Sequence, residues 1–219
     1  MLQLVKKIIY TMQTPPEFRM DFWGSFKNSI FYESKPMPWM NYEAVVAIHN
    51  FINPGDLVFE YGSGSSTRYW ISLGCKVVSV EHDKDFFQKM HGALADNCDY
   101  KLIEPELDSV INMKSHESPE NYKSSDFNNH TFEAYVKAID VYPDNHFNLV
   151  VVDGRARPSC IKHAIPKIRR GGALVLDNSD RNYYLKNTQS LLEGWPQRTY
   201  RGTVRGLLHK EQTTIFRKP

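Results

Sequence analysis

The stretch FEYGSGSST (residues 59–67) follows the apolar residues Leu57 and Val58 and combines a carboxylate, two glycines and several hydroxyl side chains. An apolar run that stops at such a turn is typical of a buried β-strand leading into a helix. Gly62 and Gly64 allow a tight turn and let the backbone approach a ligand without an intervening Cβ atom. We interpret the stretch as the turn after the first strand of an α/β sheet, at the edge where such sheets bind ligands.

Strand-like and helix-like segments alternate along most of the chain. Strands are predicted at residues 56–61, 76–81, 99–104, 147–153 and 173–177, and two β-like runs without a helix between them follow residue 195. Helices are predicted at residues 42–52, 67–72, 83–97 and 159–168. A parallel sheet covered on both faces requires strands of continuous Val and Leu that alternate with helices, as found here. The predicted fold class is therefore α/β, a Rossmann-like doubly wound, mostly parallel sheet with an antiparallel end.

This domain is predicted to span residues 41–219, after a helical or irregular cap segment at residues 1–40. Residues 105–130 are rich in Ser, Asn, Lys and Glu and predict a long loop, and loops of that length are often functional.

Composition and charge indicate which partners and which cellular location to expect. The chain of 219 residues has 27 basic and 25 acidic residues, a balance of +2 that does not favour a nucleic acid as partner. Its three cysteines lie far apart without metal-site or disulfide spacing, which indicates a reducing, cytoplasmic location. No segment approaches the roughly 20 apolar residues of a membrane span, and we expect no membrane partner.

An acidic residue indicates the ligand class. Glu81 stands nineteen residues past Gly62, at the end of the second predicted strand, where a carboxylate can accept hydrogen bonds from both hydroxyls of a ribose. A dinucleotide usually requires a third glycine in the turn, and this chain has Thr67 there. Glu60 places a negative charge before the turn, which suits a cationic ligand better than a pyrophosphate.

The E-x-G-x-G pattern followed by an acid after the second strand resembles class I S-adenosylmethionine-dependent methyltransferases, and the resemblance extends over residues 42–217. It implies a seven-stranded sheet and S-adenosylmethionine as cofactor. The implied cofactor-binding residues are Glu60, Gly62, Ser63 and Gly64 at the methionine end, Glu81 at the ribose, His82 and Glu104 at the adenine, and Asp153 between cofactor and acceptor.

The motifs FNLVVVDGRAR (residues 147–157) and GGALVLDNSDR (residues 171–181) resemble the fourth- and fifth-strand motifs of catechol and caffeoyl-CoA O-methyltransferases. That resemblance implies a divalent metal such as Mg²⁺ held by Asp153, Asp177 and Asn178. Carboxylate and amide oxygens suit a hard cation. The alternative is that these residues only cap a helix and form turns.

The chain departs from that family at the base. The family's lysine position is occupied by Ala156, between Arg155 and Arg157, and arginine cannot accept a proton. Either the metal alone activates the acceptor hydroxyl, or a nearby carboxylate, Asp153 or Asp180, takes its proton. The two arginines are predicted to hold an anionic part of the acceptor.

The expected function is methyl transfer from S-adenosylmethionine to a hydroxyl of a small molecule or sugar. Two alternatives stay open: an NAD-dependent oxidoreductase, and a non-catalytic cofactor-binding subunit with the same fold. No tyrosine has a lysine four residues later, so the Tyr-x-x-x-Lys pair of one large oxidoreductase class is absent. The sequence leaves the oligomeric state open, a homodimer included.

Overall fold

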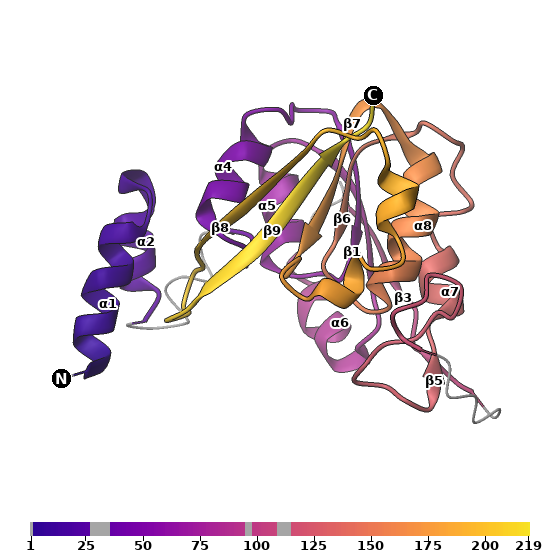
Figure 1. Cartoon of the computed structure of the whole chain (residues 1–219), viewed down its shortest axis with the longest axis horizontal. Helices are drawn as coiled ribbons and strands as arrows, with labels where there is room; N and C mark the ends of the chain where they lie inside the picture. Colours follow the sequence, from indigo (N-terminus) through magenta and orange to yellow (C-terminus); the bar gives the residue numbers. More distant parts are fainter. Residues whose placement is uncertain (1, 27–35, 95–97, 109–114) are drawn as a thin grey trace.

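A seven-stranded sheet is the centre of this computed structural model, which describes residues 2–26, 36–94, 98–108 and 115–219. The strand order is β3-β2-β1-β6-β7-β9-β8 (Figure 1). The strands are β1 (Leu57–Tyr61), β2 (Lys76–Glu81), β3 (Cys98–Leu102), β6 (Phe147–Val152), β7 (Ile168–Asp177), β8 (Gln197–Thr203) and β9 (Lys210–Arg217). The first five pair in parallel, and β9 is antiparallel to both β7 and β8. The predicted fold class is confirmed.

The four predicted helices are present with altered bounds, and the described part of the domain contains a fifth at Glu133–Lys137. They are α4 (Tyr42–His49), α5 (Ser65–Ser72), α6 (Lys84–His91), α7 (Glu133–Lys137) and α8 (Arg157–Lys167), with 3-10 turns η2 (Asn182–Tyr184) and η3 (Gln189–Leu192). The predicted helix at 83–97 begins as expected, because the Asp83 side chain accepts from the Phe86 N–H at 2.8 Å, but it ends at His91. Residues 95–97 lie outside the described residues. Within the predicted long loop, β4 (Glu106–Leu107) pairs with β5 (His130–Thr131).

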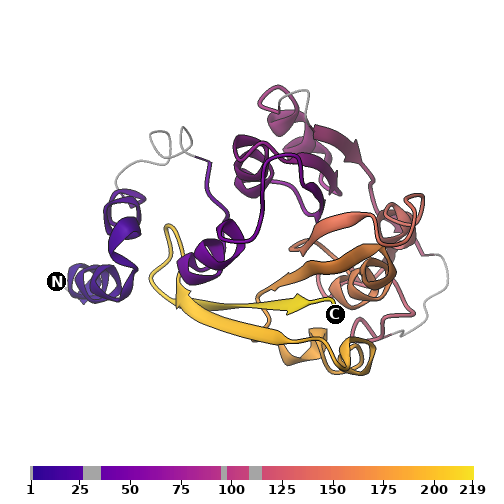
Figure 2. The same cartoon turned by 90° about the horizontal axis from the view of Figure 1, so that it is seen from above.

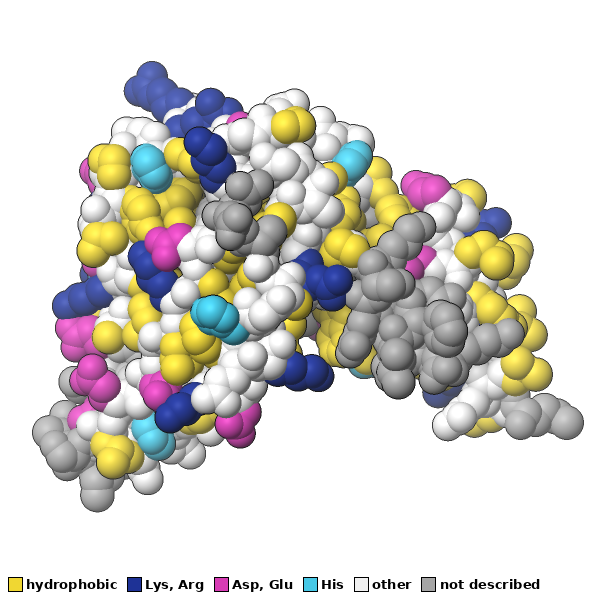
Figure 3. Space-filling view, turned by 180° about the vertical axis from the view of Figure 1, so that it is seen from behind, with side chains coloured by type: hydrophobic (Ala, Val, Ile, Leu, Met, Phe, Trp, Pro, Cys, Tyr) yellow, Lys and Arg dark blue, Asp and Glu magenta, His cyan; other side chains and the backbone are white. Residues whose placement is uncertain are grey.

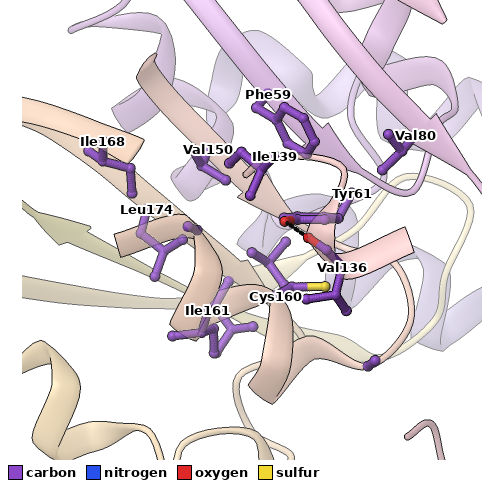
Figure 4. Packing of buried hydrophobic residues seen from close by; sticks show 14 of the residues in the cluster. Phe59, Tyr61, Val80, Val136, Ile139, Val150, Cys160, Ile161, Ile168 and Leu174 are labelled. Atoms are coloured by element: carbon purple, nitrogen blue, oxygen red, sulfur yellow. Dashed lines mark hydrogen bonds between the residues drawn. The ribbon is translucent and has the colours of Figure 1, made fainter. Parts of the chain in front are cut away.

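Side chains of each central strand alternate between two apolar clusters, one on each face of the sheet. In β1, Val58 packs toward α4 and α5, whereas Phe59 and Tyr61 pack toward α7 and α8. Figure 4 shows the second cluster, in which the Tyr61 hydroxyl donates to the Val136 carbonyl at 2.7 Å. This alternation decides which side chains of the sheet edge face which layer.

The amino-terminal segment lies beyond one edge of the sheet (Figures 1 and 2). It contains α1 (Leu2–Gln13), the 3-10 turn η1 (Pro16–Phe18) and α2 (Arg19–Gly24). The Tyr42 hydroxyl donates to Asp21 Oδ2 at 2.7 Å, and the hydroxyls of Thr14 and Thr203 lie 2.7 Å apart. Residues 2–24 of the predicted cap segment are therefore mostly helical and attached to α4 and β8, whereas residues 36–40 are irregular.

The chain order of the strands reverses between β1 and β6. From β1 the sheet continues through β2 and β3 in one direction, and from β6 through β7 in the other. In open α/β sheets, ligands bind outside the carboxyl ends of the strands at such a reversal. The turns after β1 and β6 therefore lie where this fold is expected to bind a ligand.

Candidate functional site

The turn after β1 depends on Gly62. Its φ of +89° is in the left-handed region, and a Cβ atom there would lie 2.9 Å from the backbone of Gly154 in the turn after β6. A Cβ atom on Gly154 would in turn lie 2.0 Å from the Tyr135 hydroxyl. The backbones of the two turns are in contact, and the sequence marks Gly154 only as the residue after a predicted strand.

Glu60 is fully buried and does not face open space. Its carboxylate accepts hydrogen bonds from Thr67 Oγ1 at 2.5 Å, from Trp70 Nε1 at 3.0 Å and from Ser79 Oγ at 3.2 Å. Burial raises the pKa of the Glu60 carboxyl to about 7 despite these donors. Glu60 therefore fastens the turn to α5 and β2 from within, rather than presenting its charge to a ligand as the sequence suggested.

Thr67 occupies the position where a dinucleotide-binding turn has its third glycine, and its side chain has a structural role there. Besides donating to Glu60, its hydroxyl accepts a hydrogen bond from the Gly64 N–H at 2.9 Å. The side chain thus ties the start of α5 to the strand before it. Gly64 itself has no atom within 4 Å of the position where a Cβ would stand, so the turn is open on that side.

Glu81 and Ser63 join the ends of β2 and β1. Glu81 Oε2 accepts from the Ser63 hydroxyl at 2.7 Å and from the Ser63 N–H at 3.1 Å, while the Ser63 and Tyr100 hydroxyls are 2.7 Å apart. Burial acts to raise the pKa of Glu81, but hydrogen bonds from His82, Asp83 and Ser63 outweigh it and lower the pKa to about 2. An ionised carboxylate therefore stands where the sequence predicts a ribose-binding group.

His82 lies in an aromatic cluster beside this carboxylate. Its Nε2 accepts a hydrogen bond from Arg155 Nε at 3.2 Å, so the ring proton is on Nδ1, which lies 2.8 Å from Glu81 Oε1. The ring also packs edge-on against Phe127 at a centroid distance of 5.7 Å. Arg155 also forms an ion pair with Asp126. The structure thus brings His82 and Arg155 together, which sequence spacing did not predict.

The predicted metal ligands do not form a metal site. Arg157 is buried, and its guanidinium donates to Asp153 Oδ1 at 2.9 Å, to the Gly154 carbonyl at 3.0 Å and to the Asp177 carbonyl. Asp177 Oδ1 accepts from Thr213 Oγ1 at 2.5 Å. Among the described residues no group of three His, Cys, Asp or Glu side chains is placed to hold a metal ion. The arrangement does not support the predicted metal site, because the guanidinium of Arg157 occupies the side of Asp153 where the cation was expected.

The remaining predicted residues are dispersed. The Asn178 amide donates to Glu211 Oε2 at 3.2 Å, on β9. Asp180 is exposed in the turn after β7, and Glu104 is exposed beyond β3. Asp153 keeps 27% of its side chain exposed, and burial raises its pKa in spite of the pairing with Arg157. Of the two candidate proton acceptors, Asp153 is the one beside the turns after β1 and β6.

A small polar cavity of about 30 Å³ opens next to these turns. Its lining includes Ser125, Asp126, Arg155, Arg157, Arg181 and Tyr184. Arg181 donates to the Tyr184 hydroxyl at 3.0 Å, and no ion pair joins Arg181 to a carboxylate among the described residues. The lining therefore carries four cationic side chains, those of Lys123, Arg155, Arg157 and Arg181, and one carboxylate, that of Asp126. Lys123 pairs with Asp108 and Arg157 with Asp153.

Of the comparisons with known proteins, the one with solved structures identifies proteins of similar fold. No family model and no curated protein matches the chain. Among solved structures, the chain is similar to a precorrin-6y C5,15-methyltransferase from Geobacter metallireducens, with a TM-score of 0.51 and 13% identity over 80% of this chain and 87% of that chain. It is also similar to a tRNA (m1A58) methyltransferase from Aquifex aeolicus, with a TM-score of 0.50 and 14% identity over 80% of this chain and 67% of that chain. The chain has the fold of the class I methyltransferases.

Proposed function

We propose that this protein is an S-adenosylmethionine-dependent methyltransferase that acts on a hydroxyl oxygen of a small, anionic molecule, a sugar derivative included. The observation that carries the proposal is the ionised Glu81 carboxylate beside Ser63, at the reversal point of the sheet. Two ribose hydroxyls can replace the Ser63 hydroxyl as donors to this carboxylate. Gly64 leaves the turn open where the backbone approaches the cofactor.

The chemistry requires little of the protein at the leaving group. When S-adenosylmethionine is bound, it supplies a methyl group on a sulfonium that leaves as a neutral thioether. The protein then has to hold the acceptor oxygen in line with the methyl carbon and exclude water. The contact between Gly62 and Gly154 supports this role, because it holds the turn that would carry the cofactor against the turn beside the cavity.

Asp153 is the proposed proton acceptor for the acceptor hydroxyl. Its raised pKa makes the ionised carboxylate a stronger base toward the attacking hydroxyl, and its side chain is partly accessible. The proton would pass from the acceptor oxygen to the Asp153 carboxylate as the oxygen bonds to the methyl carbon and the bond from carbon to sulfur breaks. The proposal includes no metal, because Arg157 lies where the cation was predicted.

The anionic character of the acceptor follows from the charges of the cavity. Arg157 is occupied by hydrogen bonds to the turn, so it is not the residue that we assign to the anion. Arg181 lines the cavity without a carboxylate partner among the described residues, and Arg155 has an exposed one, Asp126, that a ligand anion can displace. We assign the anion to Arg155 and Arg181.

The cofactor is tested by calorimetric titration of S-adenosylmethionine and, separately, of NAD. We expect saturable binding of the former only, and Glu81→Ala is expected to weaken it by about 2 kcal/mol, the value of hydrogen bonds to a charged group. Two further variants serve as comparisons. Glu81→Gln removes the charge but keeps the shape of the turn, and Glu193→Ala is the control, because it changes an exposed acid away from the site. Binding of NAD alone, or equal affinity in all variants, would overturn the proposal.

The acceptor is tested with two phenols that differ by one carboxylate, 3,4-dihydroxybenzoate and catechol. We expect faster methylation of the carboxylated compound, and Arg181→Gln is expected to remove that preference while cofactor affinity is kept. Methylation of both compounds at equal rates would refute the anion assignment and leave the methyltransferase proposal standing.

A further inference from the structure

Helix α1 presents its apolar side chains to the outside. The exposed fractions are 73% for Leu2, 56% for Leu4, 46% for Val5, 48% for Ile8, 47% for Ile9 and 64% for Met12. At 3.6 residues per turn these six side chains lie within an arc of about 160°. We call them the outer face of α1. Figure 3 shows hydrophobic side chains gathered at the margin of this part of the molecule.

The opposite side of α1 is the one attached to the protein. Lys7 Nζ lies 4.4 Å from the centroid of a Trp23 ring and 4.7 Å from that of Phe26. Just beyond the helix, Thr14 contacts Thr203 on β8, and Tyr10 packs against the apolar cluster of α4 and α5. A surface helix normally buries its apolar face and exposes its polar face, and α1 does the reverse. Its outer face is therefore made to contact something else.

The charges of the amino-terminal segment indicate which kind of partner can cover the outer face of α1. Residues 1–16 contain Lys6 and Lys7 and no carboxylate, and the first acidic residue is Glu17. In a two-fold pair of chains the same surface meets itself, so Lys6 of one chain would approach Lys6 of the other, and residues 1–16 hold no carboxylate to pair with it. A helix of 12 residues is also only about 18 Å long, and a stable interface needs roughly 800 Å² from each partner.

We propose that α1 binds in the plane of an anionic lipid surface, with its outer face in the acyl region and Lys6 at the headgroups. Lipid covers an apolar stripe without a matching partner surface, and anionic headgroups supply the negative charge that this helix lacks. No helix among the described residues is long and apolar enough to cross a membrane. The expectation of no membrane partner rested on the lack of a membrane-spanning segment. A helix that lies in the plane of the interface does not have to span the bilayer.

The test is co-sedimentation of the full chain with vesicles of phosphatidylcholine alone and of phosphatidylcholine with phosphatidylglycerol. We expect binding to the anionic vesicles that decreases with salt, and the double variant Val5→Gln, Ile8→Gln is expected to bind at least about tenfold more weakly. Both side chains are exposed, so this change does not disturb the core. The matched control is Val141→Gln, which removes an apolar side chain that is 78% exposed elsewhere.

Three results would overturn this proposal. They are the absence of binding to anionic vesicles, equal binding by the double variant, and a dimer in light scattering that the double variant dissociates. The last result would assign the outer face to a second copy of the chain. Titration of S-adenosylmethionine without vesicles is expected to give the same affinity in all of these proteins, so the lipid test is independent of the proposed activity.

Discussion

Glu60 gives a pH dependence of stability whose sign and size follow from its burial. Its pKa is about 7 in the folded protein, against 4.5 for an exposed glutamate. Between these values the folded state holds the proton that the unfolded state has lost, so the free energy of unfolding falls as the pH rises. At 1.36 kcal/mol per unit the full effect is about 3 kcal/mol, most of which is lost between pH 5 and pH 8.

The variant Glu60→Gln isolates this effect. Its side chain has the same shape and does not titrate, so other ionisable groups cancel when the two proteins are compared. Urea unfolding at pH 5 and pH 8 should show that the wild type loses about 2 to 3 kcal/mol more than the variant across this interval. Parallel pH profiles for the two proteins would show that Glu60 is ionised throughout, and that Thr67 and Trp70 outweigh its burial.

Three further predictions concern the turns, the amino-terminal segment and metal. Gly154→Ala should lower the unfolding free energy by about 2 kcal/mol, because its Cβ would meet the Tyr135 hydroxyl, and adding Tyr135→Phe should recover part of the loss; an unchanged melting temperature would refute the contact. Tyr42→Phe should cost about 1 kcal/mol in urea unfolding by removing the bond to Asp21, and a neutral result would show that this bond does not hold the segment. EDTA should leave methyl transfer unchanged, and inhibition reversed by Mg²⁺ would restore the metal prediction.

The sheet could be predicted because its central strands are buried on both faces. Runs such as Leu149 to Val152 leave no polar face, so a parallel sheet between helical layers is the arrangement that fits them. The structure starts β7 at Ile168, five residues before the predicted strand and at the residue where the predicted helix ends. The extra residues pair with the neighbouring strand only through a shift of register between Phe147 and Leu149.

The direction of Glu60 could have been derived from the sequence. Side chains alternate in a strand, so Glu60 shares the face of Val58 and points toward α5, where Trp70 and Thr67 lie. The prediction that Glu60 faces a cationic ligand rested on its charge alone and not on its place in the alternation of the strand. Glu81 is the last residue of β2 and pairs only with Leu102 of β3, so it lies at the carboxyl edge of the sheet, where its side chain meets the turn at Ser63.

The position of Arg157 could not be predicted from residue spacing. Its guanidinium reaches back to the carbonyls of Asp153, Gly154 and Asp177 because α8 begins at Arg157, directly after Ala156 with a φ of +48°. A long side chain can extend in many directions, and the sequence does not say which one a turn selects. The metal prediction failed at this point, since it treated the two aspartates as unpaired.

The contact between Gly62 and Gly154 also limits how this protein can be altered. A designer who transplants the first turn into another sheet must transplant the second turn with it, because each backbone occupies the space where the other would carry a side chain. The same holds for divergence among related chains, where a larger residue at either position requires both turns to change together. The smallest portable unit of this site is therefore a pair of segments, residues 60–64 and 153–157, that are distant in the sequence.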